Sequence, residues 1–233
     1  MTAIFKREFK SYFATPLGYV FLTAFYFFLG LFFSLLYGQG VPDIGAVIIA
    51  MSIIVIFGLP ILTMRLMSED RRQKVDQVLL TAPVKLTSIV MGKFLAALAV
   101  FAIGFAPTII FEIIVLSYIK VNVFLFIYTF IGMMLLGGAL IAIGMFISSL
   151  TESAVISAIL SLVINILLLY MTSFAEMVKI PWLAKVFEKI AFLTAFDSFG
   201  ENIFSIANIV YFLSIIAIFL FLCVRSLEKK RWS

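Results

Sequence analysis

Long apolar runs follow one another along almost the whole chain, and short polar or charged segments separate them. A helix needs about 20 predominantly apolar residues to cross a membrane. Runs of this length predict an all-α membrane protein with six transmembrane helices. Glycine and proline inside the runs are compatible with this prediction, because membrane helices tolerate both. The predicted spans are residues 17–37, 44–64, 94–119, 121–144 with the residues just after it, 153–172 and 203–224.

The composition supports the same fold class. Apolar residues make up 64% of the 233 residues and charged residues only 12%, whereas a soluble domain has about 45–50% and about 25%. The chain has too few charges to cover a water-facing surface, which excludes a soluble enzyme and a disordered protein. Six spans with short connections leave no room for a nucleotide-binding domain, so residues 1–233 are expected to form a single transmembrane domain.

The chain contains few residues that could do chemistry. It has no histidine, which excludes imidazole bases and histidine metal sites. Its single cysteine, Cys223, lies in a predicted span and is expected to be a small apolar side chain. No GxxxxGK[ST] phosphate loop is present. We therefore expect no catalytic residue, metal site or cofactor, and if the protein uses ATP, another chain must hydrolyse it.

The basic residues predict the orientation. If both termini are cytoplasmic, the inside segments hold three basic residues before the first span, six between the second and third spans and four after the sixth, which is 13 of the 17. An even number of spans agrees with this arrangement. The net charge of +5 then reflects topology and attraction to anionic lipid. Nucleic-acid binding is disfavoured, because no folded domain carries a basic face.

Two segments outside the spans predict helices on the cytoplasmic side. In residues 4–15, aromatic and aliphatic residues recur at helical spacing, which predicts a helix lying in the interface or an ordinary anchor before the first span. Residues 65–93 form a longer loop than two spans need. There Ser68 is expected to cap a helix of mixed charge. Such a helix could dock a cytoplasmic partner, and the alternative is a solvated charged loop. Its docking candidates are Glu69, Asp70, Arg71, Arg72 and Leu79.

The third segment, residues 173–201, lies outside by the same topology. It is too polar to span the membrane and too apolar to be fully solvated. Short amphipathic helices interrupted by Pro181 are expected, either re-entrant or resting at the outer interface, and the aromatic Trp182 fits that depth.

Two predicted spans contain polar or charged residues, which are unusual inside a membrane. Four residues spaced four apart share one face of the fifth span, and we call them the polar stripe: Ser153, Ser157, Ser161 and Asn165. The stripe either allows close helix packing or lines a polar route between two subunits. Glu112 is the one charge within a span. It either serves a cation or proton, or it reaches outward or pairs with Lys120.

The inner loop and the C-terminal end carry recognisable sequences. The loop has Glu-Asp-Arg-Arg at 69–72, Val-Leu-Leu-Thr-Ala-Pro-Val at 78–84 and Gly-Lys at 92–93, where the third span begins. These stretches, together with residues 211–214 and 220–232, resemble the permease subunits of type-2 ABC transporters, most closely the gliding-motility and nitrous-oxide-reductase-maturation branch. The loop departs from the family at Lys74, Val75 and Gln77, which occupy the positions of a Gly-Thr-x-Glu motif.

The resemblance implies a role for each segment. Residues 4–15 would be the elbow helix, the helix around 69–80 the coupling helix that enters a cleft of the ATPase, and the 148–153 turn a smaller contact. The first and fifth spans would form the dimer interface, which places the polar stripe there. Residues 173–201 would cap the exit. The implied partners are a cytoplasmic ATPase subunit that binds ATP and magnesium, a second permease subunit and, in some relatives, an accessory membrane protein.

The resulting expectation is a subunit of an ATP-driven exporter in the bacterial cytoplasmic (inner) membrane, which moves an amphipathic substrate such as a lipid, glycolipid, peptide or drug. Two alternatives stay open. An ATP-independent secondary transporter would need ion-coupling residues in several spans, and only Glu112 qualifies. A scaffold subunit of a larger motility or maturation assembly would need no transport of its own.

Overall fold

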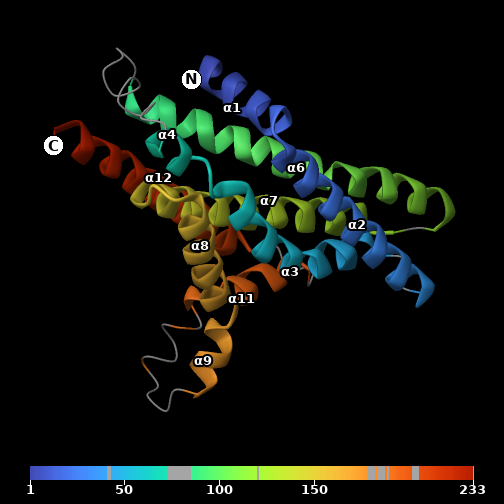
Figure 1. The fold of residues 1–233 in the computed structure, drawn as a ribbon. Helices are drawn as coiled ribbons and strands as arrows, with labels where there is room; N and C mark the ends of the chain where they lie inside the picture. Colours follow the sequence, from blue (N-terminus) through green and yellow to red (C-terminus); the bar gives the residue numbers. More distant parts are fainter. Residues whose placement is uncertain are drawn as a thin grey trace.

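A computed structural model describes residues 1–40, 43–72, 85–119, 121–177, 182, 187, 189–200 and 205–232 of the chain. Its regular elements within these ranges are all helices (Figure 1). They are α1 (Thr2–Ala14), α2 (Pro16–Gly38), α3 (Ile44–Thr63), α4 (Ser68–Arg72), α6 (Leu86–Tyr118), α7 (Val123–Leu150), α8 (Ala154–Leu169), α9 (Met171–Met177), α11 (Phe192–Asp197) and α12 (Ile206–Trp232).

Five of these helices are long and apolar enough to cross a membrane, namely α2, α3, α6, α7 and α12. They coincide with five of the six predicted spans and make the chain a multi-pass membrane protein. The predicted span at 153–172 is the shorter helix α8, which has 16 residues and is therefore about 24 Å long. That is less than the hydrocarbon thickness of about 30 Å, so a sixth complete crossing is not confirmed. The helix ends early because the backbone turns at Tyr170.

The segments outside the spans agree only in part with the prediction. Helix α1 coincides with the predicted helix at 4–15, and Pro16 begins the next helix as its first residue. The location of α1 at the membrane interface stays a prediction. Helices α9 and α11 are the regular elements described in or overlapping the segment 173–201, where Trp182 is exposed.

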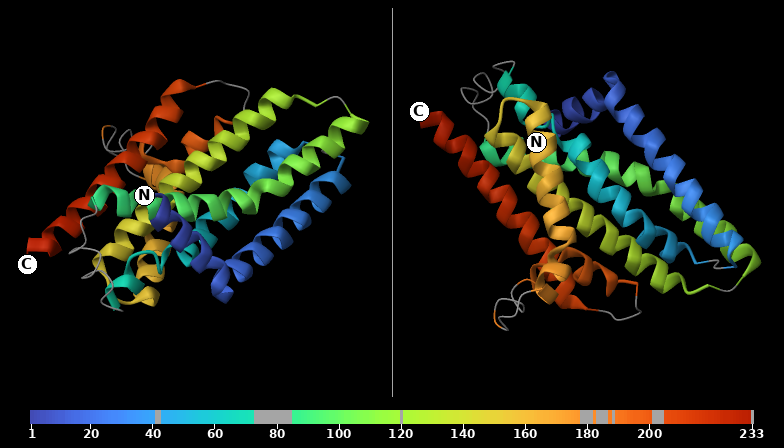
Figure 2. Two further views of the ribbon diagram at one scale, coloured as in Figure 1. Left: turned by 90° about the horizontal axis from the view of Figure 1, so that it is seen from above. Right: turned by 60° about the horizontal axis from the view of Figure 1, so that its bottom comes forward.

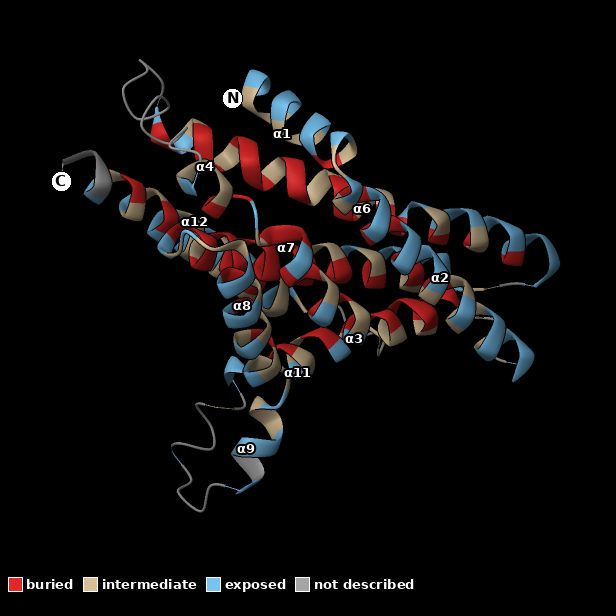
Figure 3. Ribbon diagram, in the orientation of Figure 1, coloured by how far each residue is buried: buried red, intermediate tan, exposed pale blue. Residues whose placement is uncertain are grey.

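Helix α7 lies in the middle of the bundle and packs against α3, α6, α8 and α12. Most of its side chains are buried, whereas α2 and α12 expose broad apolar faces (Figure 3). Its glycines allow this close packing, because a Cβ atom at Gly137 would overlap the ring of Phe101 and one at Gly144 would overlap Thr63. The small residues of α7 therefore act in packing, as in other membrane helix interfaces.

This packing predicts a large difference between two glycine substitutions. Gly137→Val is expected to destabilise the protein by about 1–3 kcal/mol, because the added methyl groups must displace Phe101. The matched control is Gly30→Val in α2, where an added Cβ meets no other atom within 4 Å. Melting temperatures of the two detergent-solubilised variants test the prediction, and equal melting temperatures would contradict the packing.

The two prolines inside spans each release a backbone carbonyl. Proline has no N–H, so Pro60 in α3 and Pro107 in α6 leave the carbonyls of Ile56 and Ile103 without their helical donors. A side chain from a neighbouring helix supplies the missing donor in both cases. Asn165 Nδ2 of α8 donates to the Ile56 carbonyl at 3.0 Å, and the hydroxyl of Tyr26 of α2 donates to the Ile103 carbonyl at 3.1 Å. Each proline thereby ties its helix to a neighbour.

Both termini lie at the same end of the bundle as α4, and we call this the α4 end (Figures 1 and 2). The contacts agree with the views. Arg7 of α1 lies 3.6 Å from Asp70 of α4, and Ser149 near the end of α7 donates to Ser226 of α12 at 3.2 Å. Both termini and α4 thus lie at one end of the bundle, and the location of both termini on the cytoplasmic side of the membrane stays a prediction.

Candidate functional site

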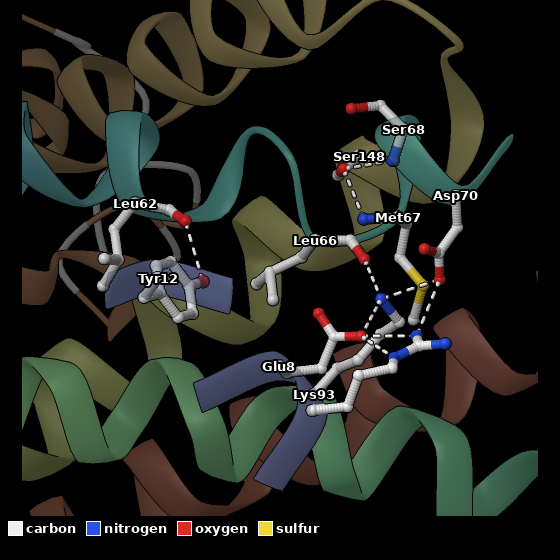
Figure 4. A network of polar contacts seen from close by, with 10 residues as sticks. Glu8, Tyr12, Leu62, Leu66, Met67, Ser68, Asp70, Lys93 and Ser148 are labelled. Atoms are coloured by element: carbon white, nitrogen blue, oxygen red, sulfur yellow. Dashed lines mark hydrogen bonds and ion pairs between the residues drawn. The ribbon is translucent and has the colours of Figure 1, made fainter. Parts of the chain in front are cut away.

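The site is built around the break between α3 and α4. Helix α3 ends at Thr63, a turn follows, and α4 begins at Ser68. A helix break leaves backbone N–H and C=O groups without helical partners, and buried groups of this kind need other ones. Side chains from α1, α6 and α7 supply them (Figure 4).

Ser148 of α7 binds three backbone groups of this break with one hydroxyl. It accepts hydrogen bonds from the N–H groups of Met67 at 3.1 Å and Ser68 at 3.0 Å, and it donates to the carbonyl of Met64 at 3.0 Å. A hydroxyl has one donor and two acceptor sites, so its capacity is fully used. The Ser68 hydroxyl donates back to the Met64 carbonyl, and the predicted cap by Ser68 stays a prediction. The predicted positions of Glu69 and Asp70 in the first turn are correct.

Lys93 is the most buried charge of the site, with only 1% of its surface exposed. Its Nζ atom lies 2.6 Å from the Leu66 carbonyl, 2.8 Å from Asp70 Oδ2 and 3.1 Å from Glu8 Oε1 (Figure 4). These acceptors satisfy all three ammonium donors and come from the α3–α4 turn, α4 and α1. With Arg7, which contacts both carboxylates, the cluster holds two positive and two negative charges. Pairing of this kind is what allows a charge to be buried.

The preceding residue explains how α1 comes so close to α6. An added Cβ at Gly92 would lie only 3.0 Å from the Ile4 side chain. Glycine at this position lets α1 pack directly on α6, and Lys93 then reaches Glu8. The Gly-Lys pair of the sequence is therefore a packing position followed by a charge-pairing position.

Tyr12 makes a second link between α1 and the break. Its hydroxyl is buried and donates to the Leu62 carbonyl at 3.0 Å. In a continuous helix this carbonyl would accept the N–H of Leu66, but that N–H bonds to the Thr63 carbonyl instead. Burial raises the pKa of the Tyr12 hydroxyl, and the negative charge of Glu8 adds to this effect. The phenol therefore stays protonated and acts as a donor.

Helix α4 is also joined to the turn between α7 and α8. Arg71 Nε lies 3.0 Å from Glu152 Oε1, and Arg71 Nη1 donates to the Leu150 carbonyl at 3.0 Å. Both side chains are partly or largely exposed, so we expect the ion pair to contribute less than about 1 kcal/mol. Helix α4 is thus held by a buried charge cluster on one side and by an exposed ion pair on the other.

A groove lies on each side of α4. One, of about 270 Å³, lies between α1 and the α3–α4 turn and includes Ser11, Arg65 and Glu69. The other, of about 400 Å³, lies between α4 and the start of α8 and includes Arg72 and Ser153. The predicted docking residues Glu69 and Arg72 therefore stand at the edges of concave surfaces. The predicted docking residue Leu79 lies outside the described residues.

Comparison with protein families decides the identity of the chain. The sequence model of the ABC-2 type transporter family matches residues 1–204. The chain belongs to the ABC-2 type transporter family. No match is found among curated proteins. ABC-2 permeases are membrane transport components that normally work with a separate ATPase subunit. The match does not extend to the gliding-motility branch, which stays a resemblance.

In this ABC-2 transporter subunit the polar stripe faces the chain's own helices. Ser157, Ser161 and Asn165 are buried where α8 packs against α3 and α7, and Ser153 caps α8 by accepting the Ile156 N–H. Asn165 bonds to α3, whereas the two serine hydroxyls have no hydrogen-bond partner among the described residues. The serines thus act here through their small size. A contact of the stripe with a second subunit stays a prediction.

Glu112 of this ABC-2 permease is buried in α6, with 4% of its surface exposed. One of its carboxylate oxygens, Oε1, has no hydrogen-bond partner within the described part of the chain. Its suggested partner Lys120 lies outside the described residues. Its role as a functional carboxylate stays a prediction.

Glu8, Tyr12 and Lys93 were not predicted from the sequence as residues of the site, and Ser148 was predicted only as the start of the smaller ATPase contact at 148–153. Lys93 could have been identified most readily, because it lies at the start of a long apolar run, where an unpaired cation is energetically costly. Its partners could not be identified, since they come from positions 8, 66 and 70.

Proposed function

We propose that this chain is the transmembrane subunit of an ATP-driven exporter and that a separate ATPase subunit docks on α4. The observation that carries the proposal is the double attachment of α4. Lys93 joins it to α1 and α6, and Arg71 joins it to the α7–α8 turn. A movement imposed on α4 would therefore reach both halves of the bundle.

The physical argument rests on the difference between the two attachments. The buried cluster around Lys93 cannot open without exposing or unpairing charges, so α1, α4 and the start of α6 would move as one body. The exposed Arg71–Glu152 pair is weak and reversible. ATP-driven closure of the ATPase would then shift α4 with α1 and α6, and the α7–α8 turn would follow or disengage.

The proposal includes the finer features inferred from the sequence. A second permease subunit, identical or homologous, completes the transporter, and the ATPase holds ATP and magnesium. Both termini lie in the cytoplasm, and the membrane is the bacterial cytoplasmic membrane. An amphipathic substrate fits best, since the spans expose aliphatic and aromatic side chains with few charges.

The experiment is a charge swap in the native complex purified through a tag on this chain. Arg71→Glu is expected to lower transport-stimulated ATPase activity up to about fivefold, the equivalent of about 1 kcal/mol. Arg71→Glu combined with Glu152→Arg should recover much of the loss, because the pair is rebuilt with reversed charges. Lys10→Glu, an exposed charge change on α1, is the control and should leave the activity unchanged.

The outcomes separate the alternatives. A complex without an ATPase that still transports would indicate a secondary transporter, and a complex without ATPase and transport would indicate a scaffold. If an ATPase is present but Arg71→Glu has no effect, or the double variant shows no recovery, the internal coupling route is wrong.

A further inference from the structure

A groove of about 310 Å³ lies between the start of α6 and the end of α12, at the α4 end. Its inner part is apolar and includes Val90, Leu220 and Val224, and its outer part includes Thr87, Arg225 and Glu228. Because α6 runs away from the α4 end and α12 runs towards it, the apolar residues lie further from the α4 end than the polar ones. The groove therefore has the polarity gradient of a membrane leaflet.

The position and exposure of the groove favour an orientation towards lipid. The groove is lined by Phe221, whose surface is 56% exposed, and by turns of α12 that belong to a candidate membrane span. An exposed apolar groove at this depth is covered by hydrocarbon in a bilayer. A water-soluble ligand would have to displace that hydrocarbon, whereas an acyl chain would fill the groove and keep its apolar residues in contact with hydrocarbon.

Arg225 holds a cation at the mouth of this groove. Its guanidinium lies 2.7 Å from Glu228 Oε2 and 5.1 Å from the centroid of the Phe221 ring. Stacking on the ring positions the guanidinium at the groove, and an arginine has five N–H donors, more than Glu228 alone can accept. The residues 225–231 carry four basic side chains and one acidic one. The local net charge therefore complements an anion at the headgroup level.

We propose that the α6–α12 groove binds an anionic phospholipid, with one acyl chain in the apolar part and the phosphate on Arg225. The apolar lining recognises the chain, and the guanidinium makes charge-assisted hydrogen bonds to the phosphate. The surplus of positive charge, after Arg225 pairs with Glu228, favours an anionic over a zwitterionic headgroup. This site uses none of the residues assigned to coupling and does not depend on the proposed function.

The test measures bound lipid on the full chain in detergent, with phosphatidylglycerol and phosphatidylcholine as probes and native mass spectrometry as the readout. Phosphatidylglycerol should bind more tightly than phosphatidylcholine. Arg225→Gln should weaken phosphatidylglycerol binding about tenfold, because a charge-assisted hydrogen bond is lost. The matched control is Lys10→Gln, which removes one exposed positive charge from α1, outside the groove, and should change binding less than about twofold.

A second variant tests the acyl-chain part independently of charge. Val224→Trp fills the groove and should abolish phosphatidylglycerol binding while Arg225 is intact. Equal binding of both lipids would overturn the proposal, as would equal effects of Arg225→Gln and Lys10→Gln, which would show general attraction of the lipid to basic residues. Unchanged binding in Val224→Trp, or equally strong competition by inorganic phosphate, would overturn the acyl-chain site.

Discussion

Lys93→Met is expected to destabilise the protein by about 3–5 kcal/mol, because removing one partner of a buried ion pair leaves the other charges uncompensated. The methionine keeps most of the side-chain volume, so the effect would come from charge. Glu8 and Asp70 would then share the single cation Arg7, and the Leu66 carbonyl would lose its donor. The denaturant midpoint or melting temperature of the solubilised protein measures this loss.

Restoring charge balance should recover much of that stability. In the double variant Lys93→Met with Asp70→Asn, Arg7 and Glu8 remain as a pair and the cluster is neutral again. Replacing both partners of a buried pair costs far less than removing one. Lys85→Met, an exposed lysine just before α6, is the control and should change stability by less than about 0.5 kcal/mol. If Lys93→Met behaves like Lys85→Met, the buried cluster does not stabilise the site.

Asn165→Leu is expected to cost about 1–3 kcal/mol, because the carbonyl of Ile56 would be left buried without a donor. The loss should depend on Pro60. Pro60→Ala restores the N–H that a regular helix offers to this carbonyl. In the Pro60→Ala background, Asn165→Leu should therefore cost clearly less.

The second proline provides the matched control for this double-mutant cycle. Pro107→Ala changes a different helix, whose released carbonyl at Ile103 is bound by Tyr26. Asn165→Leu and Pro107→Ala should be additive within about 0.5 kcal/mol, as expected of sites that share no partner. Equal costs of Asn165→Leu with and without Pro60 would show that the side chain does not compensate for the proline.

Two helix boundaries show how accurately the ends of the membrane helices can be predicted from the sequence. The apolar run of the third span was predicted at 94–119, and the helix that contains it was predicted to start at Thr87 or Ser88 and to run through Lys93. The helix begins at Leu86, close to the predicted start, and the charges of Glu8 and Asp70 allow Lys93 to be buried within it. The fifth span was predicted to reach Thr172 from its apolar character alone, but its helix ends at Leu169. Hydropathy indicates which segments are apolar enough to lie in a membrane. Packing and backbone geometry decide at which residue a helix ends.

The same limit applies to the polar stripe. Spacing of four placed Ser157, Ser161 and Asn165 on one face, and the structure shows that face buried. Spacing could not say which helix the face meets, and it could not distinguish the hydrogen-bonding Asn165 from the two serines. Nor could it connect Asn165 to Pro60, because the two residues lie on different helices.

By itself, the sequence determined the all-helical membrane class, the five predicted spans that are long helices in the structure, and the helix before the first span. These features depend on hydrophobic length and on helical periodicity, which act over neighbouring residues. Only the tertiary structure decided the partners of Lys93, the cap provided by Ser148, the use of the proline-released carbonyls and the direction of the polar stripe. Each of these joins groups far apart in the chain, and a buried charge or backbone group is satisfied by whichever partner the packing brings within hydrogen-bonding distance.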